Sequence, residues 1–454
     1  RVWPRAPVII ILIAMFNKKK KILLVAILAS VSIIAVISFY FGAYSFYHKY
    51  FPFNKSTSTV TEKIEYLDTA YNDIEKKSYN TPGYSKYGSI DFLNDKLIYM
   101  QGDGQIFLFH EKNKNFKFKK ITAQKIPINR DEFIKKHEKI HGKAKLRNFF
   151  GLRDIMINKF DLVDTTSIFV SSMDYDIDKD CYKMSVFRNE FINVDEIKLT
   201  EWKKIFSSKQ CLTSDMNYEK QYYLASSGGR IVKYDENNIL LSIGNFDGDG
   251  YYSSYIHSQD LSNDYGKIIK INLKDSTDEI FSLGHRNPQG LFLLDKDYIF
   301  ASEHGPKGGD EINLIAQGKN YGWPVATYGT DYLKKSSKVD KTNNSHNGYE
   351  KPIFSWGNNY GVSQIIVYKS DYFDKWKGNI ITSSLVGKTL TRMVFDIERK
   401  SILYIENIPI DKRIRDIIEG PNGKIVLLTD QKGGVDGFTE IPEIIFLENK
   451  LNKN

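Results

Sequence analysis

Residues 281–324 read FSLGHRNPQGLFLLDKDYIFASEHGPKGGDEINLIAQGKNYGWP, and this stretch decides the fold. Its runs GLFLL and YIFASE are short and apolar, and the polar sequence DKD separates them. Two such runs joined by a short turn are typical of a β-hairpin. The loops on both sides are rich in Gly and Pro, which favours strands ending in irregular loops over a continuous helix.

The same pattern recurs from about residue 85 onward. IFLFHE and FKFKKI flank EKNKN, RIVKY and ILLSIG flank DENN, and Pro421-Asn422-Gly423 separates two further apolar runs. Aromatic residues make up 14% of the 454 residues, which also favours strands. We therefore expect one all-β domain over 85–446. A β-propeller is the economical arrangement, because radial repetition leaves few free strand edges. No clean repeat of 40–50 residues is visible, so the number of blades does not follow from this pattern.

The segments before and after this domain are predicted to be a stalk and a tail. Residues 48–84 read as a stalk, in which Ile64, Leu67, Tyr71 and Ile74 are spaced like one face of a short amphipathic helix over 62–76. Residues 447–454 read as a polar tail.

The net charge of +9 is concentrated in one segment. Residues 111–150 contain 13 Lys and Arg against 4 Asp and Glu, so the rest of the chain is close to neutral. A solvated loop and strand edge explains this segment, and contact with a polyanion or lipid headgroups is the alternative. No nucleic-acid recognition motif accompanies it, so we expect no nucleic-acid partner.

Residues 22–47 contain no charged side chain, and as a helix they would span about 39 Å, enough to cross a membrane. The basic block Lys18–Lys21 precedes them, which predicts a cytoplasmic segment 15–21, a transmembrane anchor over 22–47 and a C-terminal domain outside the cytoplasm. A cleaved signal peptide is the alternative, although its apolar region would be shorter. Residues 1–14 precede Met15 and read as an upstream extension without a structural role.

The two cysteines, Cys181 and Cys211, exclude a disulfide-rich scaffold and a four-cysteine zinc site. Outside the cytoplasm they could form a disulfide, and two buried free thiols are the alternative.

Two loops of the opening stretch carry chemistry. GHRNPQG places Arg286, Asn287 and Gln289 in a loop next to a strand, and EHGPKGGDE places Glu303, Asp310 and Glu311 among glycines. Carboxylates and free carbonyls are hard oxygen ligands that suit Ca²⁺. On these residues alone, plain turns between blades are the simpler interpretation, and a calcium-assisted site for an anionic ligand is the alternative.

The order GHRNPQG, SEHGP, DEIN and NYGWP resembles the glucose/sorbosone dehydrogenase family, which includes soluble dehydrogenases dependent on pyrroloquinoline quinone (PQQ) and aldose sugar dehydrogenases. The resemblance covers roughly 220–430. It implies a six-bladed β-propeller that oxidises an aldose or related alcohol by hydride transfer to PQQ bound with Ca²⁺.

The resemblance also implies roles for individual residues. Arg286 and Asp310 match catalytic positions, and Asp310 matches a residue that orients the base. The remaining positions match cofactor-binding residues (Asn287, Gln289, His304, Trp356, Arg413 and Arg415) and metal ligands (Gly305 and Pro306 through their carbonyls, and Glu311 and Tyr321 at a structural Ca²⁺).

The chain departs from the family pattern at three positions. Ser226 stands where the family has a catalytic His, Val386 stands where glucose dehydrogenases have a Lys, and Phe149 or Phe150 replaces a Gln at the cofactor. A serine hydroxyl is not a general base near neutral pH without an activator. Two hypotheses therefore stand: a membrane-anchored sugar dehydrogenase, or a non-catalytic propeller that binds a protein partner.

Overall fold

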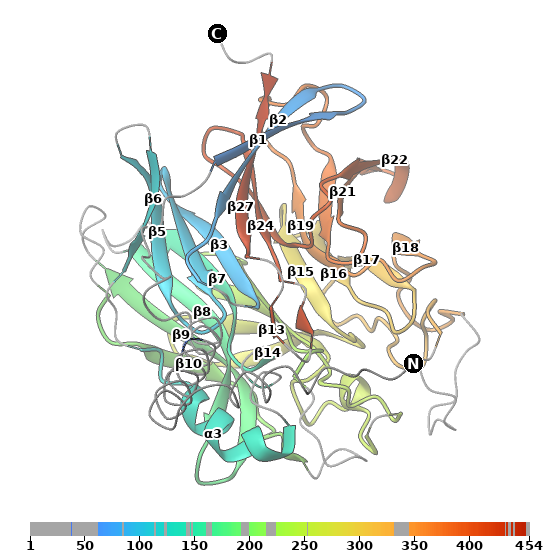
Figure 1. Cartoon of the computed structure of the whole chain (residues 1–454). Coiled ribbons are helices and arrows are strands. Elements are labelled where there is room, and N and C mark those ends of the chain that lie inside the picture. Colours follow the sequence, from blue (N-terminus) through green and yellow to red (C-terminus); the bar gives the residue numbers. More distant parts are fainter. Residues whose placement is uncertain are drawn as a thin grey trace, which may run out of the picture. The chain divides into compact units, whose positions relative to one another are not determined.

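The computed structural model describes residues 62–450 except 84–85, 113–114, 122–124, 142–145, 147–148, 160–165, 192–198, 215–223, 252, 331–344, 432, 435–436 and 439–440, and before them only Ser38. Six antiparallel sheets follow one another around a ring (Figure 1). Five of them have their first strand at the axis, and the sheet that contains both ends of the domain has β23 there. The domain is therefore a six-bladed β-propeller, as the resemblance implied.

Five blades are built from four consecutive strands each. The first blade has β3 (Gly88–Leu93), β4 (Lys96–Gln101), β5 (Ile106–Lys112) and β6 (Asn115–Lys120). The second has β7 (Leu152–Lys159), β8 (Thr166–Asp176), β9 (Cys181–Phe191) and β10 (Lys203–Ser207). The third has β11 (Gly228–Lys233), β12 (Asn238–Ile243), β13 (Lys267–Asn272) and β14 (Asp278–Leu283).

The fourth blade has β15 (Pro288–Leu293), β16 (Ile299–Glu303), β17 (Asp310–Ile315) and β18 (Phe354–Trp356). The fifth has β19 (Val362–Val367), β20 (Ile380–Ser384), β21 (Thr389–Asp396) and β22 (Ser401–Pro409). The hairpins expected from the turn sequences are confirmed as β5–β6, β11–β12, β15–β16 and β23–β24.

The last blade joins the two ends of the domain. Its order is β23 (Ile414–Glu419), β24 (Ile425–Thr429), β27 (Glu443–Asn449), β2 (Asp73–Asn80) and β1 (Glu62–Asp68). Strand β2 pairs with β27 along its length, from Ile74 opposite Asn449 to Asn80 opposite Glu443. Closing the ring in this way leaves β2 with paired neighbours on both sides.

This blade corrects two expectations. The helix expected over 62–76 is wrong, because β1 and β2 occupy these residues and a turn between Thr69 and Asn72 interrupts them. Pairing with β27 buries β2 on both faces, which the helical spacing of a few apolar residues did not anticipate. The polar tail expected from residue 447 also begins too early, since β27 continues to Asn449.

Hydrophobic clusters fill the spaces between neighbouring blades. Among the described residues, each of the six interfaces in the ring has its own cluster. Between the third and fourth blades, for example, Leu240 and Phe281 pack with Leu291 and Ile299. The alternating apolar side chains of each strand thus pack against the next sheet, which explains why so many short strands form one domain.

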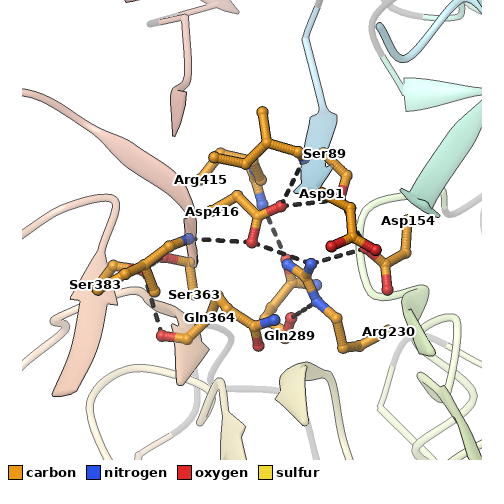
Figure 2. Close-up of polar contacts among 12 residues, drawn as sticks. Ser89, Asp91, Asp154, Arg230, Gln289, Ser363, Gln364, Ser383, Arg415 and Asp416 are labelled. Carbon is orange, nitrogen blue, oxygen red and sulfur yellow. Dashed lines mark hydrogen bonds and ion pairs between the residues drawn. The ribbon is translucent and has the colours of Figure 1, made fainter. Parts of the chain in front are cut away.

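Polar side chains tie the inner strands together at the axis (Figure 2). The carboxylate of Asp154 accepts hydrogen bonds from the Ile231 N–H of β11 (2.7 Å) and from Arg230 Nη1 (2.7 Å). Asp416 of β23 accepts the Ile90 N–H of β3 (3.0 Å) and lies 3.0 Å from the same Arg230 atom. These contacts satisfy buried backbone donors and fix neighbouring blades in register.

The Lys-rich segment 111–150 contains an unexpected helix, α3 (Arg130–His141). Phe133 on this helix is buried and stacks on Phe150 with ring centroids 4.2 Å apart. A one-turn 3₁₀ helix, η2 (His257–Gln259), and a small ladder of β25 (Gly433–Gly434) with β26 (Gly437–Phe438) lie outside the blades.

A disulfide joins Cys181, the first residue of β9, to Cys211. The backbone of the next residues, Tyr182 and Leu212, forms a two-way bridge of hydrogen bonds of 2.9 Å each. The disulfide therefore fixes the connection after β10 against the second blade.

Within the part of the chain that the structure describes, no helix is both long and apolar enough to cross a membrane. The expected anchor over 22–47 lies outside the described residues, apart from Ser38.

Candidate active site

A cavity of about 240 Å³ lies at the end of the axis where most of the inner strands begin. The segments that lead into β3, β11, β15, β19 and β23 all contribute to its wall. It brings together eight residues singled out from the family resemblance, along with Ser226: Arg286, Asn287, Gln289, His304, Gly305, Pro306, Arg413 and Arg415. It also has lining residues that the sequence did not indicate: Lys86, Tyr87, Ala225, Asn359 and Leu385.

The charge of the wall has one sign. Four basic side chains line the cavity, namely Lys86, Arg286, Arg413 and Arg415, and no Asp or Glu is among its described lining residues. The buried Nε atoms of Arg286 and Arg415 have no hydrogen-bond partner among the described atoms. Such a wall fits a ligand with several negative charges, because guanidinium groups match carboxylates in charge and shape.

Arg286 is held over the loop that follows β16. Its Nη1 atom donates to the carbonyl oxygens of Gly305 (2.8 Å) and His304 (3.3 Å), and its guanidinium lies 5.3 Å from the centre of the Trp323 ring. These contacts direct the side chain into the cavity.

Asp310 holds the same loop in place through backbone hydrogen bonds. Its carboxylate accepts the Gly305 N–H (3.0 Å), the Val362 N–H (3.3 Å) and the Gly361 N–H. A Cβ atom at Gly305 would lie 2.2 Å from the carbonyl oxygen of Gly308, so the fold requires glycine there. Asp310 itself does not line the cavity, and its contacts describe a positioning residue.

A chain of hydrogen bonds links the cavity to the axial network. Arg415 Nη1 donates to Gln289 Oε1 (2.9 Å), and Gln289 Nε2 donates to Asn287 Oδ1 (2.9 Å). The Gly228 N–H donates to the same Asn287 oxygen (3.0 Å). Figure 2 shows Arg415 and Gln289 beside Asp416 and Arg230. The orientation of these side chains therefore depends on three blades at once.

The Nδ1 atom of the His304 ring acts as a hydrogen-bond acceptor. Its Nε2 atom contacts the carbonyl oxygen of Val362 and must carry the proton, which leaves Nδ1 to accept from Asn287 Nδ2 at 3.4 Å. Burial, with the nearby Arg286 and Arg415, lowers the pKa of His304, so the ring is neutral near pH 7.

Ser226 has a partner that sequence reasoning missed. Its hydroxyl donates to Asp247 Oδ1 at 2.7 Å. Asp247 lies in the polar turn after β12, and its backbone has a left-handed φ of +55°. Nothing in the sequence around Asp247 indicates that its carboxylate faces Ser226.

The missed residues Lys86 and Tyr87 lie just before β3, outside the segment of family resemblance. Two guanidinium groups contact the Tyr87 ring: Arg153 Cζ lies 4.0 Å and Arg415 Cζ 4.6 Å from its centre. Lys86 Nζ lies 3.9 Å from the centre of the Phe149 ring. Val386, at the position of the family lysine, is 50% exposed and does not line the cavity.

Trp356, Glu311 and Tyr321 lie away from the cavity wall. Trp356 stacks on Tyr360 in the core between the fourth and fifth blades, with ring centroids 4.9 Å apart. The Tyr321 hydroxyl donates to the Leu314 carbonyl (2.7 Å) and accepts the Ala316 N–H (2.9 Å). Burial, together with the nearby Glu303, raises the pKa of Glu311.

The described residues contain no cluster of three or more His, Cys, Asp or Glu side chains that could hold a metal ion. At the cavity, the protein offers the carbonyls of Gly305 and Pro306, and the Gly305 oxygen already accepts from Arg286. These oxygens alone do not form a complete Ca²⁺ site, so a cation there needs further oxygen ligands from a bound molecule or from water.

Known proteins are similar to this chain in sequence and in fold. The family described as Glucose / Sorbosone dehydrogenase matches residues 89–436. The chain is 30% identical to the aldose sugar dehydrogenase YliI of Escherichia coli over 264 residues, which are 53% of this chain and 64% of that protein. It is 28% identical to the quinoprotein glucose dehydrogenase B of Acinetobacter calcoaceticus over 244 residues, 40% of this chain and 51% of that protein.

The matched region thus spans less than two thirds of either relative. A solved glucose dehydrogenase structure has the same fold, with a TM-score of 0.64 at 22% identity over 81% of this chain and 98% of that one.

Proposed function

Because this chain belongs to the Glucose / Sorbosone dehydrogenase family, we propose that it is a PQQ-dependent sugar dehydrogenase that oxidises a hydroxyl group of an aldose or related alcohol. The observation that carries the proposal is the cavity wall with four basic side chains and no described acidic one. PQQ carries three carboxylates, so its charge complements this wall.

The cofactor, when bound, supplies an electrophilic quinone that accepts a hydride. Arg413 and Arg415 would hold its carboxylates, with Asn287 and Gln289 beside them. The carbonyls of Gly305 and Pro306 would hold Ca²⁺, which acts as a Lewis acid at such a quinone. Arg286 would stabilise negative charge that develops on the reacting oxygen.

The hydroxyl proton of the substrate needs an acceptor, and Ser226 with Asp247 supplies one in this proposal. The Ser226 Oγ atom can accept a hydrogen bond from the substrate while its own proton is donated to Asp247 Oδ1. Proton movement along this pair would place the proton on the carboxylate and leave the serine hydroxyl unchanged. Asp247 thus provides the activator that Ser226 lacks in isolation.

We also propose that the chain is a single-pass protein of the cytoplasmic membrane with the propeller outside the cytoplasm. The uncharged segment 22–47 and the basic block before it support this topology. The disulfide between Cys181 and Cys211 supports an oxidising compartment.

Reconstitution tests the function. The full chain, purified in detergent and supplied with PQQ and Ca²⁺, should reduce an artificial dye when aldoses are added. Binding of PQQ is followed separately by absorbance titration. Absence of PQQ binding would refute the proposal. Binding of PQQ without dye reduction by any aldose or related alcohol would favour the second candidate, a non-catalytic propeller that binds a protein partner, which the serine at the family's histidine position motivates.

A further inference from the structure

Lys86 is the basic residue of the cavity that no sequence pattern indicated. It comes from the segment before β3, whereas Arg413 and Arg415 come from the start of β23. Strands β3 and β23 are neighbours in the closed ring, so residues that are far apart in the sequence of the propeller line the same cavity.

The backbone turns Lys86 toward this position. Tyr87, the next residue, has a φ of +58°, in the left-handed region that non-glycine residues adopt at a cost of about 1 kcal/mol. The contacts of the Tyr87 ring with Arg153 and Arg415 hold this conformation in place. The conformation is thus fixed by the same arginine that lines the cavity.

The surroundings of Lys86 are mostly apolar or basic. Phe149 lies under its ammonium group, and the charges around it are Arg153 on β7, Arg413 and Arg415 at β23, and Asp430 after β24. Asp430 pairs with Arg415 Nη2, and among the described residues it is the carboxylate that acts on Lys86. An additional negative charge in the cavity would relieve this imbalance.

We propose that Lys86 is a ligand-binding residue that contacts a carboxylate of the bound cofactor, as a fourth basic contact beside Arg286, Arg413 and Arg415. The identity of the cofactor rests on the proposed function. The class of ligand, a polycarboxylate, rests on the cavity alone. In this proposal Lys86, from the segment before the first blade, takes the place of the family lysine, whose position is occupied by Val386 in this chain.

Proton uptake gives this proposal a specific signature. Burial, together with Arg415, Arg413 and Arg153, lowers the pKa of Lys86 to about 8. At pH 9 much of the lysine is therefore neutral, and a carboxylate that binds beside it raises its pKa and draws a proton from solution. At pH 7 the lysine is already charged, and little uptake follows.

The experiment is calorimetric titration of the full-length apoprotein with PQQ at pH 7 and pH 9, in two buffers of different ionisation enthalpy. We expect proton uptake at pH 9 in the unaltered protein. Lys86→Gln should remove this uptake and weaken PQQ binding by about tenfold or more, the usual loss for one charge-assisted contact. Lys86→Arg should keep the affinity but abolish the uptake, because arginine stays charged. Lys388→Gln, at an exposed lysine, is the matched control and should change neither.

The outcomes separate the two proposals. If Lys86→Gln binds PQQ as tightly as the unaltered protein, the role of Lys86 is refuted and the proposed function stands. A second titration uses benzene-1,3,5-tricarboxylate as a simple polycarboxylate. Binding of this probe that depends on Lys86, without PQQ binding, would refute the proposed cofactor and support the anion site. If neither molecule binds, both proposals fail.

Discussion

The hydroxyl of Ser226 and the carboxylate of Asp247 form a hydrogen-bonded pair, with 2.7 Å between Oγ and Oδ1, and Ser226 lies on the wall of the cavity. The two residues are brought together by the turn from β12, which passes the start of β11. In the proton path proposed above, the carboxylate would act as the base and the serine would contact the substrate.

We predict that Asp247→Asn lowers turnover by about 10²–10⁴-fold, the usual contribution of general base catalysis, while the affinity for PQQ is unchanged. Steady-state dye reduction and absorbance titration measure the two quantities. Ser226→His, introduced into the Asp247→Asn protein, should restore part of the turnover because imidazole is itself a base. Asp260→Asn, at an exposed carboxylate nearby, should have no effect. Full activity of Asp247→Asn would exclude the proton path proposed above.

The two arginines before and on β23 should respond differently to replacement. Arg413→Gln should weaken PQQ binding by about tenfold or more with little change in stability, since a charge-assisted contact is lost from a half-buried side chain. Arg415→Gln should also destabilise the fold by about 3–5 kcal/mol, because it removes the guanidinium that pairs directly with the buried carboxylate of Asp430. Urea unfolding of the apoproteins distinguishes them; equal stability of the two variants would contradict the structural role of Arg415.

Asp91 predicts a particular dependence of stability on pH. Burial raises the pKa of its carboxyl group to about 7, from 3.8 in the unfolded chain. Between these values the folded protein holds a proton that the unfolded chain releases, so this group makes the protein less stable as the pH rises from 4 to 7. The effect is at most about 4 kcal/mol. Asp91→Asn should remove this part of the slope in urea unfolding measured from pH 4 to 8, and an unchanged slope would refute the assignment.

The disulfide should contribute substantially to stability. Cys181 and Cys211 are 30 residues apart, and closing such a loop stabilises the folded state by roughly 3–4 kcal/mol in the chain-entropy model. The Cys181→Ser, Cys211→Ser double variant should unfold at correspondingly lower urea concentration, and reductant should move the unaltered protein toward the variant. If reductant has no effect on the unaltered protein, the bond does not contribute in solution.

Local patterns in the sequence predicted the hairpins, because each turn sequence lies between the two strands that it joins. The ring closure could not be predicted in this way, since β2 pairs with β27 across almost the whole domain. The spacing of Ile64, Leu67, Tyr71 and Ile74 imitated a helix face, and only the pairing partner decides that these residues form strands.

The residues of the candidate site likewise divide into those that local motifs indicate and those that only the folded chain brings together. Arg286, Asn287 and the arginines of β23 could be found because they belong to motifs that are continuous in the sequence. Lys86 and Asp247 could not, because their roles depend on neighbours contributed by other blades and by the turn after β12. Asp310 was indicated, but its contacts with Gly305 and Val362 show a positioning role that only the folded loop reveals.

The closing blade has a consequence for how the protein is made. A growing chain can form its first five blades from consecutive strands as they leave the ribosome. Arg413 and Arg415 are synthesised long after Lys86, so the basic wall of the cavity is complete only when β23 has been made. The complete cavity therefore exists only after β27 has paired with β2. A ligand that contacts both Lys86 and the arginines of β23 would bind only molecules in which the ring is closed. By binding them it would hold the first and the last blade together.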